Sequence, residues 1–388
     1  MRALLLIHAA LASASALLSP QTPLSLSNSA THDPNSALLA LHRRLIETPS
    51  ISGNESTLAE WLADYLRSEN LTVALLPVPT RGPNLLAHAG HSRATRVLIT
   101  SHIDTVPPFI PYSLQHNGTE IWGRGSVDAK ACVAAQITAF LHLLHNNTIS
   151  PSDASLLFVT GEETGGEGML SFSPTSPGYE SVIFGEPTEG KLAAGHKGMV
   201  SFHLRVRGKA AHSGYPWLGV SANSVLVRAL GVLLDLEPAL PSSEKYGAST
   251  LNVGRVDGGV AANVVAQEAR ADVAIRLAGG EPDTVKAQIR EALEPIKKDV
   301  EGKGGLLEIE WANRAYPPVD MDADVEGFES ITVNYGTDVP NLAGEHRRYL
   351  YGPGSILVAH GDDEHLAIED LVRAVGDYER LIMAALEK

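Results

Sequence analysis

Short apolar segments that alternate with helical patterns constrain the fold of this chain more than any other feature. Residues 96–100, 155–160 and 181–184 each contain three or four consecutive apolar side chains, a pattern typical of strands buried on both faces of a sheet. A fourth candidate strand, 355–359, precedes a long helical pattern at 366–386. This alternation predicts an α/β domain with a mostly parallel sheet.

Side chains that can bind metals or move protons follow each predicted strand. His102 comes after the first strand, Glu162 and Glu163 after the second, Glu186 after the third and His360 after the fourth. Open α/β sheets bind ligands in the crevice beyond the carboxyl ends of their strands. One such residue is more often a solvated loop residue, but four coincidences of this kind predict a common site.

The segment 198–311 follows a different pattern. Residues 199–207 alternate between apolar and polar side chains, as expected for a strand with one solvated face. The later elements are helices at 221–236 and from 282 onward, and strands at 249–256, 271–277 and 306–311. The order β-α-β-β-α-β is that of a ferredoxin-like domain. We therefore expect this domain to be inserted into a catalytic domain made of 20–197 and 312–388.

The first 19 residues predict a signal peptide. An Ala/Leu-rich run with small residues at alternate positions follows Met1-Arg2, and no later apolar stretch is long enough to span a bilayer. Four sequons offer acceptor sites for glycans, at Asn54, Asn70, Asn117 and Asn146. We therefore expect a secreted glycoprotein, with the vacuole as the alternative location.

The net charge and the cysteine content limit which partners and which kinds of metal site are possible. The net charge of −15 disfavours nucleic acid and an anionic membrane surface as partners, because both attract basic patches. Cys132 is the only cysteine, so the chain can form neither an internal disulfide nor a thiolate metal site. The fold must be held by its core or by metal.

Five side chains together offer the donors of a two-metal site. His102 and His360 supply nitrogens, while Asp128, Glu163 and Glu186 supply oxygens, which suits two divalent ions such as zinc, with cobalt or manganese as alternatives. Asp128 precedes an Ala-rich helix and can bridge both ions. Such ions polarise a scissile carbonyl and lower the pKa of a shared water. A carboxylate that binds no metal must then accept the proton, and the pair at 162–163 supplies one ligand and one base.

Six motifs make the chain similar to the M20 family of metallopeptidases. They are Ser-His-Ile-Asp-Thr-Val, Gly-Arg-Gly-Ser-Val-Asp-Ala-Lys, Gly-Glu-Glu-Thr-Gly-Gly, Gly-Glu-Pro-Thr, His-Lys-Gly and Ala-His-Ser-Gly-Tyr-Pro, in the order that the family shows. The similarity extends from about Ala37 to the C-terminus. The family includes acetylornithine deacetylase, succinyl-diaminopimelate desuccinylase, aminoacylase and several carboxypeptidases.

The resemblance implies two zinc ions per subunit and a ligand set for each. The ligands are His102 and Glu186 for one ion, Glu163 and His360 for the other, and Asp128 between them. Glu162 becomes the general base. Two histidines stand near the end of the chain, and the family pattern selects His360 over His365 because His360 follows Gly352-Pro353-Gly354 and the predicted strand.

Roles for residues around the metals also follow from the resemblance. Asp104 corresponds to the carboxylate that orients the imidazole of His102. In the inserted domain, His212 resembles the oxyanion donor, and Asn263 and Arg276 are expected to grip the free carboxylate of the substrate. For Arg276, a solvated charge on a strand face is the competing interpretation. The resemblance further implies a homodimer, formed through the inserted domain, in which His212 enters the partner's active site.

Three functions are compatible with these residues. A hydrolase of the carboxypeptidase type, which cleaves peptides next to a free C-terminal carboxylate, is favoured because secretion suits the use of extracellular peptides. An N-deacylase of acylated amino acids performs the same amide hydrolysis, but metabolic deacylases usually work inside the cell. A non-catalytic binding protein is the remote alternative, since a relative without activity would be expected to have lost Glu162 or a ligand. We therefore expect a small peptide or an N-acyl amino acid as substrate.

Overall fold

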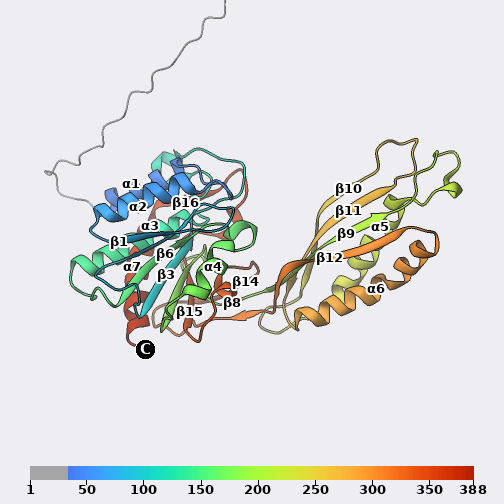
Figure 1. Ribbon diagram of the computed structural model, residues 1–388. Coiled ribbons are helices and arrows are strands. Elements are labelled where there is room, and N and C mark those ends of the chain that lie inside the picture. Colours follow the sequence, from blue (N-terminus) through green and yellow to red (C-terminus); the bar gives the residue numbers. More distant parts are fainter. Residues whose placement is uncertain (1–33) are drawn as a thin grey trace, which may run out of the picture.

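The computed structural model describes residues 34–388, which form two domains (Figure 1). One domain surrounds a six-stranded sheet, and the other carries a four-stranded sheet with two long helices. The predicted signal peptide, 1–19, lies outside the described residues. Within the described range, no helix is long and apolar enough to cross a membrane.

The larger sheet has the strand order β1-β2-β6-β3-β7-β15. Its strands are β1 (Thr72–Leu76), β2 (Asn84–His88), β3 (Val97–His102), β6 (Ala154–Val159), β7 (Ser181–Gly185) and β15 (Arg347–Tyr351). Strands β6, β3, β7 and β15 pair in parallel, whereas β1 and β2 join the sheet as antiparallel strands. The carboxyl ends of the parallel strands therefore meet at one edge of the sheet.

Both faces of this sheet are covered, which explains why its strands are apolar throughout. Neighbouring residues point into different cores: Ile99 packs with the large helices, and Leu98 packs on the opposite side. One face is covered by α1 (Pro34–Glu47), α2 (Ser56–Ser68), α3 (Lys130–His145) and α7 (Ile368–Leu386). The other face is covered by α4 (Glu167–Phe172) and a small sheet of β13 (Val319–Asp320), β8 (Leu192–His196) and β14 (Ser330–Val333). A third small sheet consists of β16 (His365–Ala367), β5 (Glu120–Trp122) and β4 (Ser113–Gln115).

The strand expected at 355–359 is wrong. Part of that run is a single turn of 3-10 helix, Ile356–Val358, which begins where Ser355 Oγ accepts the N–H of Leu357 at 3.3 Å. Leu357 is 85% exposed, so this apolar run has no core to face. The strand of the sheet is instead β15, which begins with charged residues. Arg347 pairs with Asp324, while the last three residues of the strand are buried.

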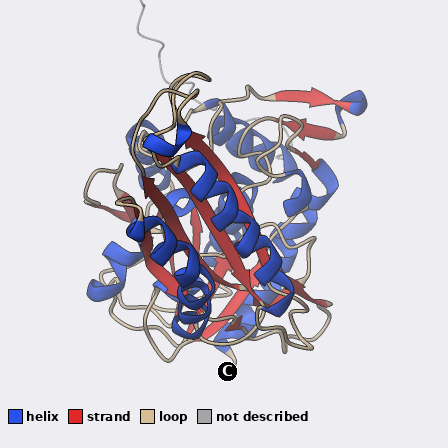
Figure 2. Ribbon diagram, turned by 90° about the vertical axis from the view of Figure 1, so that its right-hand side faces the viewer, coloured by secondary structure: helices blue, strands red, loops and turns tan. Residues whose placement is uncertain are grey.

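The second domain is an antiparallel sheet with the strand order β10-β11-β9-β12. Figure 2 looks at the molecule from this side, with the helices in front of the strands. In chain order the elements are β9 (Gly198–Arg207), α5 (Ala222–Leu236), β10 (Thr250–Gly258), β11 (Glu268–Leu277), α6 (Pro282–Gly302) and β12 (Leu306–Tyr316). Buried residues of β9 alternate with polar ones and pack against both helices. The predicted ferredoxin-like order is therefore confirmed.

The two domains are joined at one end of this second sheet. Tyr316, at the end of β12, pairs with Met199 at the start of β9, and Arg276 of β11 lies opposite Met199 on the other side. At the opposite end, Leu306 of β12 pairs with Arg207 of β9. The sheet thus has an end beside the catalytic domain and an end far from it (Figure 1).

Candidate metal centre and active site

Loops at the carboxyl edge of the larger sheet bring the five predicted ligands together. His102 ends β3, Glu186 follows β7, and Glu163 lies in a 3-10 turn after β6. Asp128 is two residues before α3, and His360 follows the turn that replaces the predicted fourth strand. The parallel arrangement of β6, β3 and β7 is what makes their loops neighbours.

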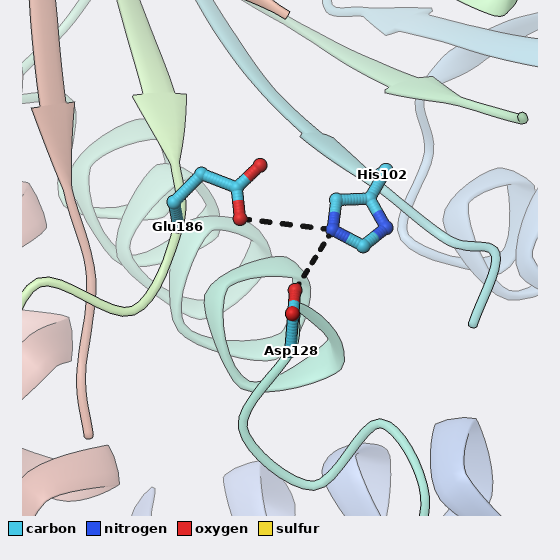
Figure 3. A group of neighbouring side chains, drawn as sticks. All are labelled: His102, Asp128 and Glu186. Carbon is cyan, nitrogen blue, oxygen red and sulfur yellow. Dashed lines mark hydrogen bonds and ion pairs between the residues drawn. The ribbon is translucent and has the colours of Figure 1, made fainter. Parts of the chain in front are cut away.

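Three of these residues form a buried group (Figure 3). His102 Nε2 lies 3.0 Å from Asp128 Oδ1 and 3.7 Å from Glu186 Oε2, with the two carboxylates on different sides of the ring nitrogen. His102, Asp128 and Glu186 are 2%, 5% and 7% exposed. The donors of this group can therefore converge on an ion that is shielded from water.

Asp128 also belongs to a second group. Its Oδ2 lies 3.3 Å from His360 Nε2, which is 3.0 Å from Glu163 Oε2. In each group, one ligand atom per residue lies within 4.8 Å of the others. Because its two oxygens face different groups, Asp128 is placed to bridge two ions.

The donors and their electrostatics fit two divalent cations. Glu163 Oε1 is buried, and no group in residues 34–388 satisfies it by a hydrogen bond, which is costly unless a cation does so. Burial raises the pKa of Glu186 to about 7. Burial also acts to raise the pKa of Asp128, but hydrogen bonds from the two histidines outweigh it and hold that pKa below its usual value. Hydrogen bonds to Asp128 and then to Glu163 raise the pKa of His360 to about 10. Cations at this crowded acidic site would take the place of these protons.

Glu162 stands beside both groups without belonging to either. It lines a small cavity together with His102, Glu186 and Asp338. Burial, followed by the charge of Glu186, raises the pKa of Glu162 well above its usual value. A carboxylate with a raised pKa and no metal to bind suits proton transfer, and its role as the base stays a prediction.

Comparison with known proteins identifies the family. A model of the peptidase dimerisation domain, M20_dimer, matches residues 194–301. A probable carboxypeptidase from Aspergillus flavus is 49% identical over 386 residues, which cover 91% of this chain and 88% of that protein. The chain belongs to the M20 family of peptidases. It is therefore an enzyme, a metallopeptidase, as the sequence motifs predicted.

Two solved structures show how widely the fold of this M20 peptidase is shared. An M20 family metallo-carboxypeptidase from Sulfolobus solfataricus matches with a TM-score of 0.70 at 17% identity, covering 90% of this chain and 99% of that one. A dinuclear metal-binding M20 peptidase from Bacillus subtilis matches with a TM-score of 0.64 at 16% identity, covering 91% and 99%. At these identities the likeness concerns the fold alone, and it confirms the predicted fold class.

Asp104 of the M20 peptidase differs from the expected arrangement. His102 Nδ1 contacts the backbone carbonyl of Asp104 at 2.9 Å, whereas the nearer carboxylate oxygen is 3.7 Å away. The carboxylate instead accepts the backbone N–H groups of Glu162 and Glu163 at 3.1 and 3.3 Å, and the hydroxyl of Ser52 at 2.7 Å. Its side chain therefore holds the turn with the predicted base, and its carbonyl orients the imidazole.

Sequence reasoning missed Glu364, which ties two ligand loops of the M20 peptidase together. Glu364 Oε1 accepts the N–H groups of Val127 and Asp128, both at 3.2 Å, and Oε2 accepts from Arg124 Nη1 at 2.7 Å. Arg124 also donates to the carbonyl of His360 at 3.4 Å. Both charged side chains are 1% exposed. A signal existed in the sequence, because Arg124 is four residues before one ligand and Glu364 four residues after another.

The inserted domain places its three predicted site residues at two different ends. His212 and Asn263 are exposed at the far end, where His212 forms a β-bridge with Val264. Arg276 lies at the near end, opposite Met199. The ten residues of strand β11 extend from one of these ends to the other, a distance of about 30 Å. Asn263 and Arg276 of one chain therefore lie far apart, and their joint role in binding a carboxylate stays a prediction.

Proposed function

We propose that this protein is a secreted dizinc carboxypeptidase that hydrolyses the amide bond next to the free C-terminal carboxylate of small peptides. The observation that carries the proposal is the pair of ligand groups that share Asp128, with Glu162 beside them and bound to neither. The name of the Aspergillus flavus relative, a probable carboxypeptidase, supports the substrate class. Histidine nitrogens and carboxylate oxygens suit zinc, and cobalt or manganese would accept the same donors.

The residues of the site have separable tasks. Bound divalent ions would polarise the scissile carbonyl and lower the pKa of the attacking water. Glu162 accepts the proton of that water and delivers it to the leaving amine, and its raised pKa suits both steps. Asp104 keeps Glu162 in position through the backbone of the turn. Glu186 is buried, which limits the access of bulk water on its side of the site.

Arg276 supports a preference for substrates with a free carboxylate. It is half-buried at the end of the inserted domain that adjoins the catalytic domain. In the part of the chain that the structure describes, no carboxylate lies within ion-pair distance of its guanidinium, whose one hydrogen bond is to Met199 Sδ at 3.5 Å. A guanidinium in this state is available for a carboxylate ligand.

A homodimer would place His212 where it can act. The match to the peptidase dimerisation domain covers most of the inserted domain, and His212 is exposed at the end far from its own metal centre. In a dimer formed through this domain, His212 of one subunit donates to the oxyanion that develops in the other subunit. Each active site then contains residues of both chains.

Secretion is part of the same proposal. The asparagines of all four sequons are exposed, which a glycan acceptor requires: Asn54, Asn70, Asn117 and Asn146. Expression in a eukaryotic host, followed by N-terminal sequencing of the protein in the medium, tests the predicted cleavage after residue 19. Loss of mass on enzymatic deglycosylation identifies the occupied sequons.

A hydrolysis screen tests the activity. Zinc-loaded protein is assayed against free dipeptides, the same dipeptides with an amidated C-terminus, and N-acetyl amino acids, with Glu162→Gln as the inactive control. We expect turnover of the free dipeptides and a much higher KM, or no turnover, for the amides. Equal cleavage of acid and amide would point to an aminopeptidase. A strong preference for N-acetyl amino acids would replace the proposal with an N-deacylase.

A further inference from the structure

The turn that carries the predicted base is rich in glycine. We call residues 161–166, which follow β6, the base turn; they contain Glu162 and the predicted ligand beside it. Gly161 and Gly166 have the left-handed backbone conformation, with φ angles of 74° and 75°, and a third glycine lies between them. Glycine loses more conformational freedom on folding than any other residue and has no side chain to pack. The direction of Glu162 therefore depends on contacts from outside the turn.

Two side chains of the catalytic domain fix the first part of the base turn. Asp104 accepts the backbone N–H groups of Glu162 and Glu163 at 3.1 and 3.3 Å. Arg81 Nη2 donates to the hydroxyl of Thr164 at 2.6 Å. Both side chains belong to the same domain as the turn, so their contacts do not depend on where the inserted domain lies.

The last part of the base turn is bound by the inserted domain. Arg314, a half-buried residue of β12, donates from Nη1 to the carbonyl oxygen of Gly165 at 2.8 Å. The N–H of the same glycine donates to the carbonyl of Glu162 at 3.2 Å. A single residue thus connects the guanidinium with the predicted base. Hydrogen bonds from a charged donor are stronger than those between neutral groups.

An irregularity in β12 brings Arg314 to this position. The strand pairs with β9 up to Trp311 and again from Ala315, and the register shifts between these two residues. Arg314 lies within the shifted stretch. Extra residues of this kind bend a strand and re-aim its side chains. Because β12 is paired with β9 on both sides of the shift, Arg314 keeps its place relative to the sheet of the inserted domain.

Gly166 lets the guanidinium approach the backbone of the base turn. A Cβ atom at Gly166 would lie 2.9 Å from Arg314 Nη1 and 2.6 Å from Asp338 Oδ1, and it would overlap with Asn341 Nδ2. Arg314 therefore packs over the turn together with two residues of the catalytic domain. The ring centroid of Tyr316 lies 5.3 Å from the guanidinium carbon and adds a cation–π contact.

We propose that Arg314 is a positioning residue, through which the inserted domain sets the direction of the base Glu162. With the two domains placed as in Figure 1, the bond to Gly165 holds the base turn in the conformation that puts Glu162 beside the ligand groups. A shift of the inserted domain that breaks this bond would loosen the turn. The inference rests on the proposed function, because it assumes that Glu162 is the base.

Arg314→Met is the direct test, because it removes the N–H donors and keeps an unbranched side chain beside Tyr316. We expect kcat for a free dipeptide to fall about 10- to 100-fold, with KM changed by less than about threefold. A misdirected base slows proton transfer, whereas substrate binding stays as it was. Arg314→Lys keeps a cationic donor for the carbonyl of Gly165, so its kcat should lie between those of Arg314→Met and the wild type.

Lys245→Met is the matched control. Lys245 also reaches from the inserted domain to the catalytic domain, where its Nζ donates to the carbonyl of Ala194 at 2.7 Å and pairs with Asp320 at 2.8 Å. The variant removes a cation that joins the two domains elsewhere than at the base turn. It should keep the kcat and KM of the wild type. The comparison separates the bond to Gly165 from a general loosening of the contact between the domains.

Hydrogen exchange provides a readout that depends neither on turnover nor on bound metal. The N–H groups of Glu162 and Glu163 are protected by their bonds to Asp104, and mass spectrometry follows them in a peptide that contains the base turn. In the metal-free protein, Arg314→Met should speed their exchange about tenfold, because the turn opens more often. Arg314→Lys should have a smaller effect, and Lys245→Met should have none.

Glu162→Gln separates this inference from the proposed function. If Glu162→Gln keeps wild-type activity, Glu162 is not the base and that part of the proposed function fails. If Glu162→Gln is inactive, while Arg314→Met and Arg314→Lys keep the wild-type kcat and exchange rate, the role of Arg314 is overturned and Glu162 remains the base. A rise in KM at unchanged kcat, or equal losses in Arg314→Met and Lys245→Met, would overturn it as well. Thermal melts of all variants establish that they are folded.

Discussion

The carboxylate of Asp104 accepts a hydrogen bond from the backbone N–H of Glu162 at 3.1 Å. Its other oxygen accepts the N–H of Glu163 at 3.3 Å. One side chain just after β3 therefore holds the turn after β6, on which the predicted base and a predicted ligand are adjacent. The different tasks of these two glutamates depend on the direction that this turn gives each side chain.

The roles of Glu162 and Glu163 can be separated by metal content. Glu162→Ala should retain two metal ions and lose about 10²–10⁴-fold in kcat, because it removes the base and no ligand. Glu163→Ala should lose one ion. Elemental analysis of both purified variants measures their metal content. Glu162→Asp should also have a low kcat, because the shorter side chain moves the carboxylate away from the attacking water. If Glu162→Ala loses a metal while Glu163→Ala keeps two, the roles are reversed.

Metal affinity should rise with pH. In the metal-free protein, the hydrogen bonds to Asp128 and Glu163 raise the pKa of His360 to about 10, so its ring is protonated at pH 7. An incoming zinc ion must displace that proton, and lowering the pH therefore weakens binding. Between pH 6 and 8 we expect about a tenfold gain in affinity per pH unit for each proton released. Calorimetry in buffers of different ionisation enthalpy counts the protons, and a count of zero would contradict the prediction.

Loss of Glu364 should affect both stability and metal binding. Glu364→Gln leaves Arg124 buried without its counter-ion, which typically costs about 3–5 kcal/mol of unfolding free energy. Zinc affinity should fall as well, since Glu364 holds the backbone of Asp128. Denaturant unfolding and zinc titration measure the two effects. Glu47→Gln, which breaks the exposed ion pair with Arg43, is the control and should change neither. Similar behaviour of the two variants would argue against the role of Glu364.

His212 can be tested by complementation between subunits. His212→Ala should lower kcat by about 10²–10³-fold without loss of zinc, because an oxyanion donor is removed. When inactive His212→Ala and inactive Glu162→Ala subunits exchange, one site in each mixed dimer contains an intact His212 and an intact Glu162. Activity should therefore return. Mixed dimers that form and stay inactive, or a protein that is monomeric in solution, would exclude the trans arrangement.

Local sequence patterns determined much of this protein. His102 and Glu186 could be assigned to one site because each directly follows an apolar strand, and parallel strands bring their carboxyl ends to one edge. The inserted domain could be predicted because its strands and helices are long enough to show the spacing of apolar side chains that is typical of each. Both inferences use information that lies within a single element of secondary structure.

Other features were decided only by contacts between distant segments. The strand β15 begins with Arg347 and Arg348, and its buried remainder depends on pairing with β7. Arg124 and Glu364, 240 residues apart, meet only when two loops pack together. Arg276 reaches the catalytic domain because its strand runs antiparallel to β9. The periodicity of a short element predicts which of its residues will be buried. The contact partner of a side chain depends on how distant segments pack together, and only the tertiary structure decides this.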